Sequence, residues 1–164
     1  MSDVKVRIFI EAPYTQALGA FQRRLGLADE SAEGTCDLTL IVPAGAHEIA
    51  RVVNAATRRL PGEANYLSHF AISWPAGRTS GGVPTPAFSG VLALGAGENY
   101  QECVLELSGS YAPPGGPAGG VFDEVIGRRI AHTTLSMLLD DVGRELRTDH
   151  ERIESEKKVE RTRP

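Results

Sequence analysis

A β-hairpin in residues 88–109 most constrains what this chain can fold into. Its two strands, residues 88–94 and 100–109, flank a connection of glycine and asparagine residues that tolerate the positive φ of a tight turn. The second strand places Cys103, Leu105, Leu107 and Tyr111 on one face. Glu102, Val104 and Glu106 fall on the other face, so the sheet has one dry side that another element has to cover.

Residues 118–147 are the segment that can provide this cover. Apolar side chains recur there every three or four residues, which is the spacing of an amphipathic helix. One line of the helix holds Phe122, Ile126, Ile130, Thr133 and Met137, and a neighbouring line holds Val125, Leu135, Leu138, Leu139, Val142 and Leu146. At ~1.5 Å per residue, this helix is long enough to cross a sheet.

The earlier part of the chain adds further strands and a short helix. Alternation of apolar with polar residues predicts strands at residues 4–10, 38–42 and 69–74. Residues 13–25 predict an amphipathic helix that ends at Gly26, and residues 76–86 predict a long loop rich in glycine and proline.

The segment from His47 to Leu60 allows two interpretations. Its apolar residues fit a helical stripe, formed by Ile49, Val52, Val53, Ala56 and Leu60. They also fit the alternation of a strand more loosely, through Ile49, Arg51, Val53 and Ala55. Spacing favours the helix, but β-branched residues suit either state, so both alternatives stay open on these grounds.

Length and charge limit the class of protein. With 164 residues, the chain is expected to form one domain over residues 1–147, and the charged segment 148–164 predicts a frayed helix end or a disordered tail. A net charge of -4 and a pI near 5.6 disfavour nucleic acid and anionic membranes as partners. The mean hydropathy of -0.16 argues against a transmembrane segment, and the N-terminus lacks a signal-peptide pattern. We therefore expect a soluble cytoplasmic protein.

The chain lacks the residue patterns of a metal or cofactor site. Cys36 and Cys103 are too far apart for a CxxC pair and are expected to be buried packing residues. No metal-ligand spacing relates the four histidines, which are His47, His69, His132 and His150. We expect no metal, no cofactor and no recognisable catalytic constellation.

The junction between the last strand and the last helix carries a resemblance. The run Leu105-Glu106-Leu107-Ser108-Gly109-Ser110-Tyr111-Ala112-Pro113-Pro114-Gly115-Gly116 leads into Gly119-Gly120-Val121-Phe122-Asp123-Glu124-Val125-Ile126. It resembles the helix-grip superfamily (SRPBCC) of START, polyketide-cyclase and plant allergen-type proteins. The resemblance implies an α+β fold with a curved antiparallel sheet wrapped around the long C-terminal helix. It also implies that residues 47–57 form a strand, paired through the Pro61-Gly62 turn with the strand around Phe70.

The resemblance also implies a cavity at the interface between the curved sheet and the long helix. Strand parity and helical spacing place eight residues at this interface: Trp74, Leu105, Leu107, Tyr111, Phe122, Ile126, Thr133 and Met137. Arg129 of the helix is a ninth candidate ligand-binding residue. Trp74 and Tyr111 combine apolar bulk with one polar atom, and Arg129 is a candidate for fixing a carboxylate if it points inward rather than into solvent.

The leading functional hypothesis is the binding, without chemistry, of a small hydrophobic or amphipathic ligand such as a lipid. A cyclase or dehydratase-like enzyme is an alternative, with acid–base work by a cavity residue such as His69, His132 or Arg129. A homodimeric interaction module formed through exposed strand faces, including Phe9 and Ile41, is a third. The sequence does not identify the ligand.

Overall fold

The computed structural model describes residues 2–27, 31–44, 46–62, 64–78, 84–112 and 124–163. Within these residues, six strands form an antiparallel sheet in the order β1-β8-β7-β4-β3-β2. Their bounds are β1 Ser2–Ile10, β2 Glu33–Ala44, β3 His47–Arg59, β4 Leu67–Trp74, β7 Ala87–Ala96 and β8 Cys103–Ala112. Two short strands, β5 Gly77–Arg78 and β6 Pro84–Thr85, pair with each other. The helices are α1 Tyr14–Arg24 and α2 Glu124–Thr162.

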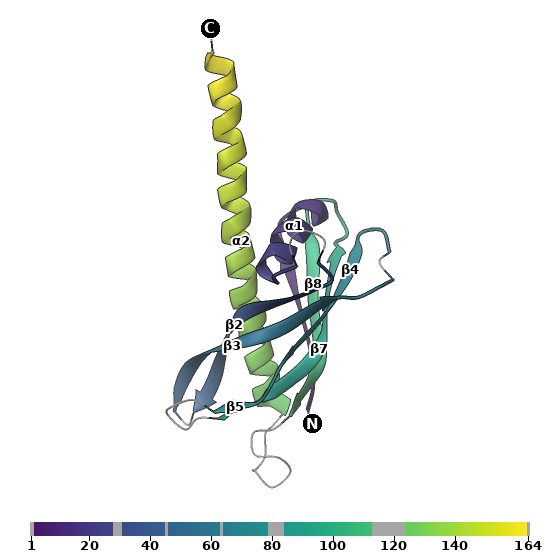
Figure 1. Ribbon diagram of the computed structural model, residues 1–164, viewed down its shortest axis with the longest axis vertical. Coiled ribbons are helices and arrows are strands. Elements are labelled where there is room, and N and C mark those ends of the chain that lie inside the picture. Colours follow the sequence, from purple (N-terminus) through teal and green to yellow (C-terminus); the bar gives the residue numbers. More distant parts are fainter. Residues whose placement is uncertain are drawn as a thin grey trace.

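The long helix closes the open side of the sheet. Helix α2 packs against both β1 and β2, which are the two edge strands. Because both edges reach the same helix, the sheet is curled into a half-barrel, as Figure 1 shows. Helix α1 packs against α2 and β7. This is the helix-grip arrangement, so the predicted α+β fold class is confirmed.

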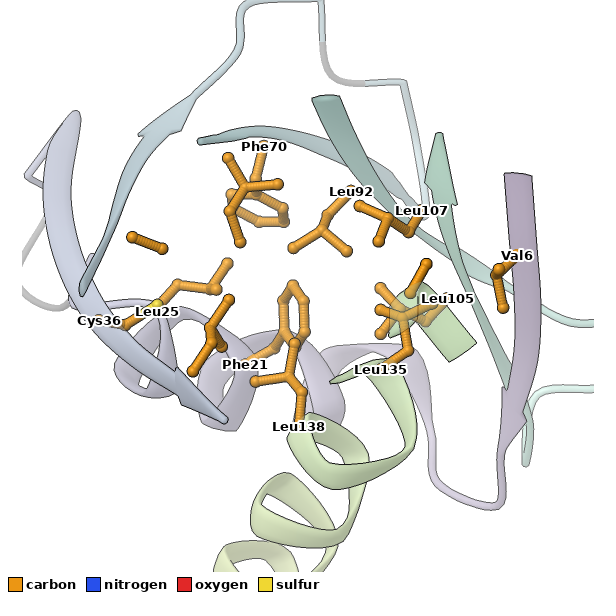
Figure 2. Close-up of a cluster of buried hydrophobic side chains, with 14 of the residues drawn as sticks. Val6, Phe21, Leu25, Cys36, Phe70, Leu92, Leu105, Leu107, Leu135 and Leu138 are labelled. Atoms are coloured by element: carbon orange, nitrogen blue, oxygen red, sulfur yellow. The ribbon is translucent and has the colours of Figure 1, made fainter. Parts of the chain in front are cut away.

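The core fills the space between the inner face of the sheet and the two helices. Figure 2 shows Phe21 of α1 and Leu138 of α2 pointing toward Phe70 and Leu92 of the sheet, and all four side chains are buried. Burying each such side chain contributes roughly 1.5–3 kcal/mol. Cys36 and Cys103 are free and buried, as predicted, and the Cys103 thiol donates a hydrogen bond to the Ala12 carbonyl at 2.8 Å.

The ambiguous segment is a strand. β3 pairs with β2 along nearly its whole length, from Arg58 opposite Glu33 to His47 opposite Ala44. The Pro61-Gly62 turn then leads into β4, where Arg59 lies opposite Phe70. The strand interpretation is therefore confirmed, and the helical spacing was misleading because pairing partners on both sides outweigh an intrinsic preference.

Helix α1 is tied to the sheet where it ends. Gly26 follows the helix with φ 72°, and a Cβ there would lie 2.2 Å from the Thr35 carbonyl oxygen of β2. Glycine is required on both counts. The buried Thr57 hydroxyl of β3 donates a hydrogen bond to the Leu25 carbonyl at 2.7 Å. The predicted helix over residues 13–25 and its stop at Gly26 are confirmed.

Helix α2 continues far beyond the half-barrel. The charged segment, for which the sequence predicts a frayed end or a disordered tail, is helical as far as Thr162. Glutamate, lysine and arginine are strong helix formers, and ion pairs at helical spacing join Arg152 to Glu156 and Lys157 to Glu154. No helix in the described part of the chain has the length and apolar character needed to cross a membrane.

Candidate functional site

Three aromatic side chains form a cluster at one end of the half-barrel. Trp74, Phe88 and Tyr111 lie side by side on β4, β7 and β8, because Phe88 is in register with both of the others. The Trp74 and Phe88 ring centroids are 4.6 Å apart, and those of Phe88 and Tyr111 are 4.8 Å apart. All three are buried, and the Trp74 indole N–H donates to the Pro86 carbonyl at 3.0 Å. Burial raises the pKa of the Tyr111 hydroxyl far above its ordinary value.

The cluster depends on two glycines that face each other. Gly90 and Gly109 are direct cross-strand partners on β7 and β8. A Cβ at either position would lie 2.7 Å from the Phe88 ring. The absence of both side chains therefore lets the Phe88 ring lie across the strands, where it stacks on Trp74.

A slit opens beside this cluster, where β3 leaves β4. In the described residues, β3 and β4 pair only between 56–59 and 70–73, and the chain then continues from Trp74 toward β5. The hollow between the strands has a volume of about 260 Å³. It is lined by Arg51, Val52, Val53 and Asn54 of β3 and by Pro75, Ala76, Gly77 and Thr85 on the facing side, and we call it the β3–β5 slit.

Arg51 is the charged residue of the slit that belongs to the inner face. It lies opposite Leu40, which is fully buried, and it shares strand parity with the buried Ala55 and Thr57. Its Nε atom is buried and has no hydrogen-bond partner among the described residues. A buried donor without a partner costs about 1–3 kcal/mol. The Nε of Arg59, further along the same face, is also buried without a partner among the described residues, but its Nη2 donates to the Leu27 carbonyl at 3.3 Å.

The opposite end of the half-barrel is closed by α1. The Phe21 and Phe70 ring centroids are 5.6 Å apart, and the Tyr14 and Ser68 hydroxyls are joined by a 2.6 Å hydrogen bond. Figure 1 shows α1 and β5 at opposite ends of the curled sheet. A ligand that enters the half-barrel would therefore have to use the end that holds the slit.

The predicted sheet residues lie where parity places them. Trp74, Leu105, Leu107 and Tyr111 are all buried on the inner face. Ile126 is half-buried against the core, and Phe122 lies outside the described residues. The four predicted sheet residues thus lie together on the inner face of the sheet.

Helix α2 turns a different face toward the sheet than the sequence predicts, so Arg129, Thr133 and Met137 do not lie in the core. Met137 is 36% exposed. Arg129 is exposed and forms an ion pair with Glu48. Thr133 is half-buried, and its hydroxyl donates a hydrogen bond to the Arg129 carbonyl. The buried face consists of Gly127, Ile130, Ala131, Thr134, Leu135, Leu138 and Val142. The small residues on this face carry little hydrophobic signal, yet they allow α2 to approach the edge strands closely. Arg129 therefore links α2 to the β2–β3 hairpin instead of pointing inward.

The candidates for acid–base chemistry are not brought into the interior. His132 is exposed, and His69 is half-buried at a position with outward parity on β4. Within the described segments, no group of three or more His, Cys, Asp or Glu side chains could hold a metal ion. Sequence reasoning missed Phe88 and Arg51. Arg51 could have been found from the alternation of the strand, because it falls on the same face as the apolar residues Val53 and Ala55.

Comparisons with known proteins bear on the fold. No protein-family model matches the chain, and no curated protein matches it. A conserved protein from Geobacillus kaustophilus matches with a TM-score of 0.56 and 12% identity, covering 90% of this chain and 96% of that one. TTHA0849 from Thermus thermophilus matches with a TM-score of 0.50 and 12% identity, covering 90% and 98%. Human STARD10 has a TM-score of 0.45 and 10% identity, covering 92% and 68%.

At such identities a structural match shows the architecture alone. The curled antiparallel sheet, whose two edges both contact α2, agrees with the resemblance seen at the β8–α2 junction. The chain therefore has the helix-grip fold.

Proposed function

We propose that this chain binds a small amphipathic molecule with an acidic head group at the slit end of the half-barrel. The observation that carries the proposal is Arg51, whose buried Nε lacks a hydrogen-bond partner among the described residues beside an open hollow. A guanidinium binds a carboxylate or phosphate through two parallel N–H donors. An acidic group in the slit would satisfy Nε and neutralise the charge in one step.

The apolar part of the ligand follows from the surroundings of Arg51. The slit also exposes Val53 and Pro75, and Pro75 directly follows Trp74 of the aromatic cluster. Ligand pockets usually measure about 300–1,000 Å³, so a hollow of about 260 Å³ suits a head group and the start of a chain. The remainder of the ligand extends past Trp74 toward the inner face, where the core side chains would have to move to admit it.

Trp74 makes this proposal measurable, since it is the single tryptophan of the chain. The experiment titrates the protein with decanoate and with decanol, which both have ten carbon atoms and differ in the head group, and follows tryptophan fluorescence. We expect decanoate to bind more tightly than decanol. Arg51→Met keeps the side-chain stem and removes the charge, so it should weaken decanoate binding about tenfold, or ~1.4 kcal/mol, and leave decanol unchanged.

The matched control is Arg58→Met. Arg58 lies on the same strand but is exposed on the opposite face. This variant should bind both compounds as the parent protein does. Equal loss of decanoate binding in both variants, or equal affinity of the parent for the two compounds, would contradict the role given to Arg51.

A further inference from the structure

The C-terminal part of α2 projects from the half-barrel with its side chains in solvent. Residues 151–163 are all exposed, and Figure 1 shows this part of the helix standing clear of every other element. Residues 148–162 span about 22 Å. Two apolar side chains lie on this extension, Ile153 at 43% exposure and Val159 at 62%.

A groove lies at the base of the extension, between α2 and the end of β1. Its volume is about 630 Å³. The β1 side contributes Phe9, whose side chain is 66% exposed, and Ala12. The α2 side contributes Leu139, Gly143, Leu146 and His150.

The helix face that lines this groove continues along the extension. Residues 139, 143, 146 and 150 follow one another at helical spacing, and the same stripe reaches Ile153 and Lys157. Val159 lies off the stripe. One stripe, with apolar side chains at Leu139, Leu146 and Ile153, thus begins inside the groove and ends in solvent.

In the described part of the chain, no contact requires glycine at position 143, in the middle of this stripe. A Cβ there would meet no atom within 4 Å, and the φ of Gly143 is not in the left-handed region. Glycine inside a helix costs about 1 kcal/mol relative to alanine. A small residue at such a position lets another helix come close.

The charges beside the stripe are complementary in an antiparallel arrangement. Asp140 and Arg147 flank the stripe near the groove, and Glu151 and Lys158 flank it on the same side along the extension. No ion pair involves any of these four side chains in the described part of the chain. If two α2 helices run antiparallel around a twofold axis near residues 149–150, Asp140 of one copy meets Lys158 of the other. Arg147 of one copy then meets Glu151 of the other.

We propose that a second copy of this chain lays its C-terminal extension in the groove, so that two α2 helices pair antiparallel in a symmetric dimer. The same register sets Ile153 of each copy against Leu146 of the other. Each copy thus covers the stripe of its partner. The contact is self-complementary, as a twofold interface has to be.

The test measures the mass of the full chain by sedimentation equilibrium over a range of concentrations. We expect a monomer–dimer equilibrium. Ile153→Asp, in the exposed extension, should raise the dissociation constant of the dimer at least tenfold. Val159→Asp changes a more exposed apolar residue of the same extension, off the stripe, and should leave the dissociation constant unchanged.

A charge exchange tests the register. Asp140→Lys and Lys158→Asp should each weaken the dimer, and the double variant should restore most of the lost affinity. A monomer at all concentrations would overturn the proposed arrangement, and so would equal effects of Ile153→Asp and Val159→Asp on the dissociation constant. A double variant whose loss of dimer affinity equals the summed losses of Asp140→Lys and Lys158→Asp would overturn it as well. Circular dichroism on every variant verifies that α2 remains helical.

Discussion

Replacing Gly109 by alanine tests the geometry of the aromatic cluster most directly. A Cβ at this position would lie 2.5 Å from the Ser89 carbonyl oxygen, 2.6 Å from the Gly90 Cα and 2.7 Å from the Phe88 ring. Carbon atoms in contact prefer separations of about 3.5–4.0 Å. Two of the three neighbours are backbone atoms and have little freedom, so β7 and β8 must separate by ~1 Å, and the Phe88 ring must also shift from its place beside Trp74.

The expected loss of stability follows from opposing effects. Overpacking of this kind costs about 1–3 kcal/mol, and alanine recovers about 0.5–1 kcal/mol by restricting the unfolded chain. We expect the free energy of unfolding to fall by about 1–2 kcal/mol, which lowers Tm by about 2–8 °C for a chain of this size. Urea unfolding followed by Trp74 fluorescence measures the change. The native spectrum should also shift, because Phe88 stacks on Trp74.

Gly77→Ala is the matched control, since a Cβ at Gly77 meets no atom within 4 Å. This variant should be as stable as the parent protein or slightly more so. If Gly109→Ala is also as stable as the parent and leaves the native fluorescence unchanged, the close contact of Phe88 with the two strands is refuted.

Two further predictions concern the packing of α2 and the buried thiols. Ile130→Asp should unfold the chain because it buries a carboxylate without a partner. Met137→Asp should lower the free energy of unfolding only a little, because Met137 is 36% exposed. Similar melting temperatures of the two variants would contradict the buried face assigned to α2. Burial raises the pKa of Cys36 and of Cys103 to about 11, above the ordinary value near 8.5. The folded state therefore favours the protonated thiols, and their contribution to stability is complete below pH ~8.5 and lost as the pH rises toward ~11. Urea unfolding between pH 8 and pH 11 should show this fall, with a smaller slope in Cys103→Ala.

The sheet was predictable wherever one face is apolar along a whole strand. Alternation in β1 and β8 places Val4, Val6, Leu105 and Leu107 on the inner face, and all four are buried. β3 was ambiguous because only two of its inner positions, Ile49 and Val53, hold large apolar residues. Arg51, Ala55 and Thr57 are held there by their neighbours in the sheet and by α1. Only the family resemblance indicated a strand.

The face that α2 buries was less predictable than the helix itself. Hydrophobic spacing finds large side chains, and it put Met137 inward with Ile130. Contact with two edge strands instead selects a face on which Gly127, Ala131 and Thr134 bring the backbone close to the sheet. Thr134 satisfies its buried hydroxyl on the Ile130 carbonyl at 2.7 Å, so it is compatible with an apolar contact. These three small residues carry almost no signal in a hydrophobic pattern, whereas the large residues of the same face, Leu135, Leu138 and Val142, were part of the predicted apolar surface.

Arg51 shows what strand parity can reveal about a binding site. A charged side chain with inward parity on an amphipathic strand has two physical solutions: it reaches a polar partner inside the fold, or it lies where the sheet is open. Arg59 takes the first solution with one nitrogen only: its Nη2 donates to the Leu27 carbonyl, while its Nε has no partner among the described residues. Arg51 takes the second, because β3 has already separated from β4 at its position and the β3–β5 slit lies beside it. The pairing of β3 with β4 ends at Ala56, and this end therefore determines where an acidic ligand could reach Arg51. Pairing that continued past Ala56 would close the β3–β5 slit and remove the proposed binding site.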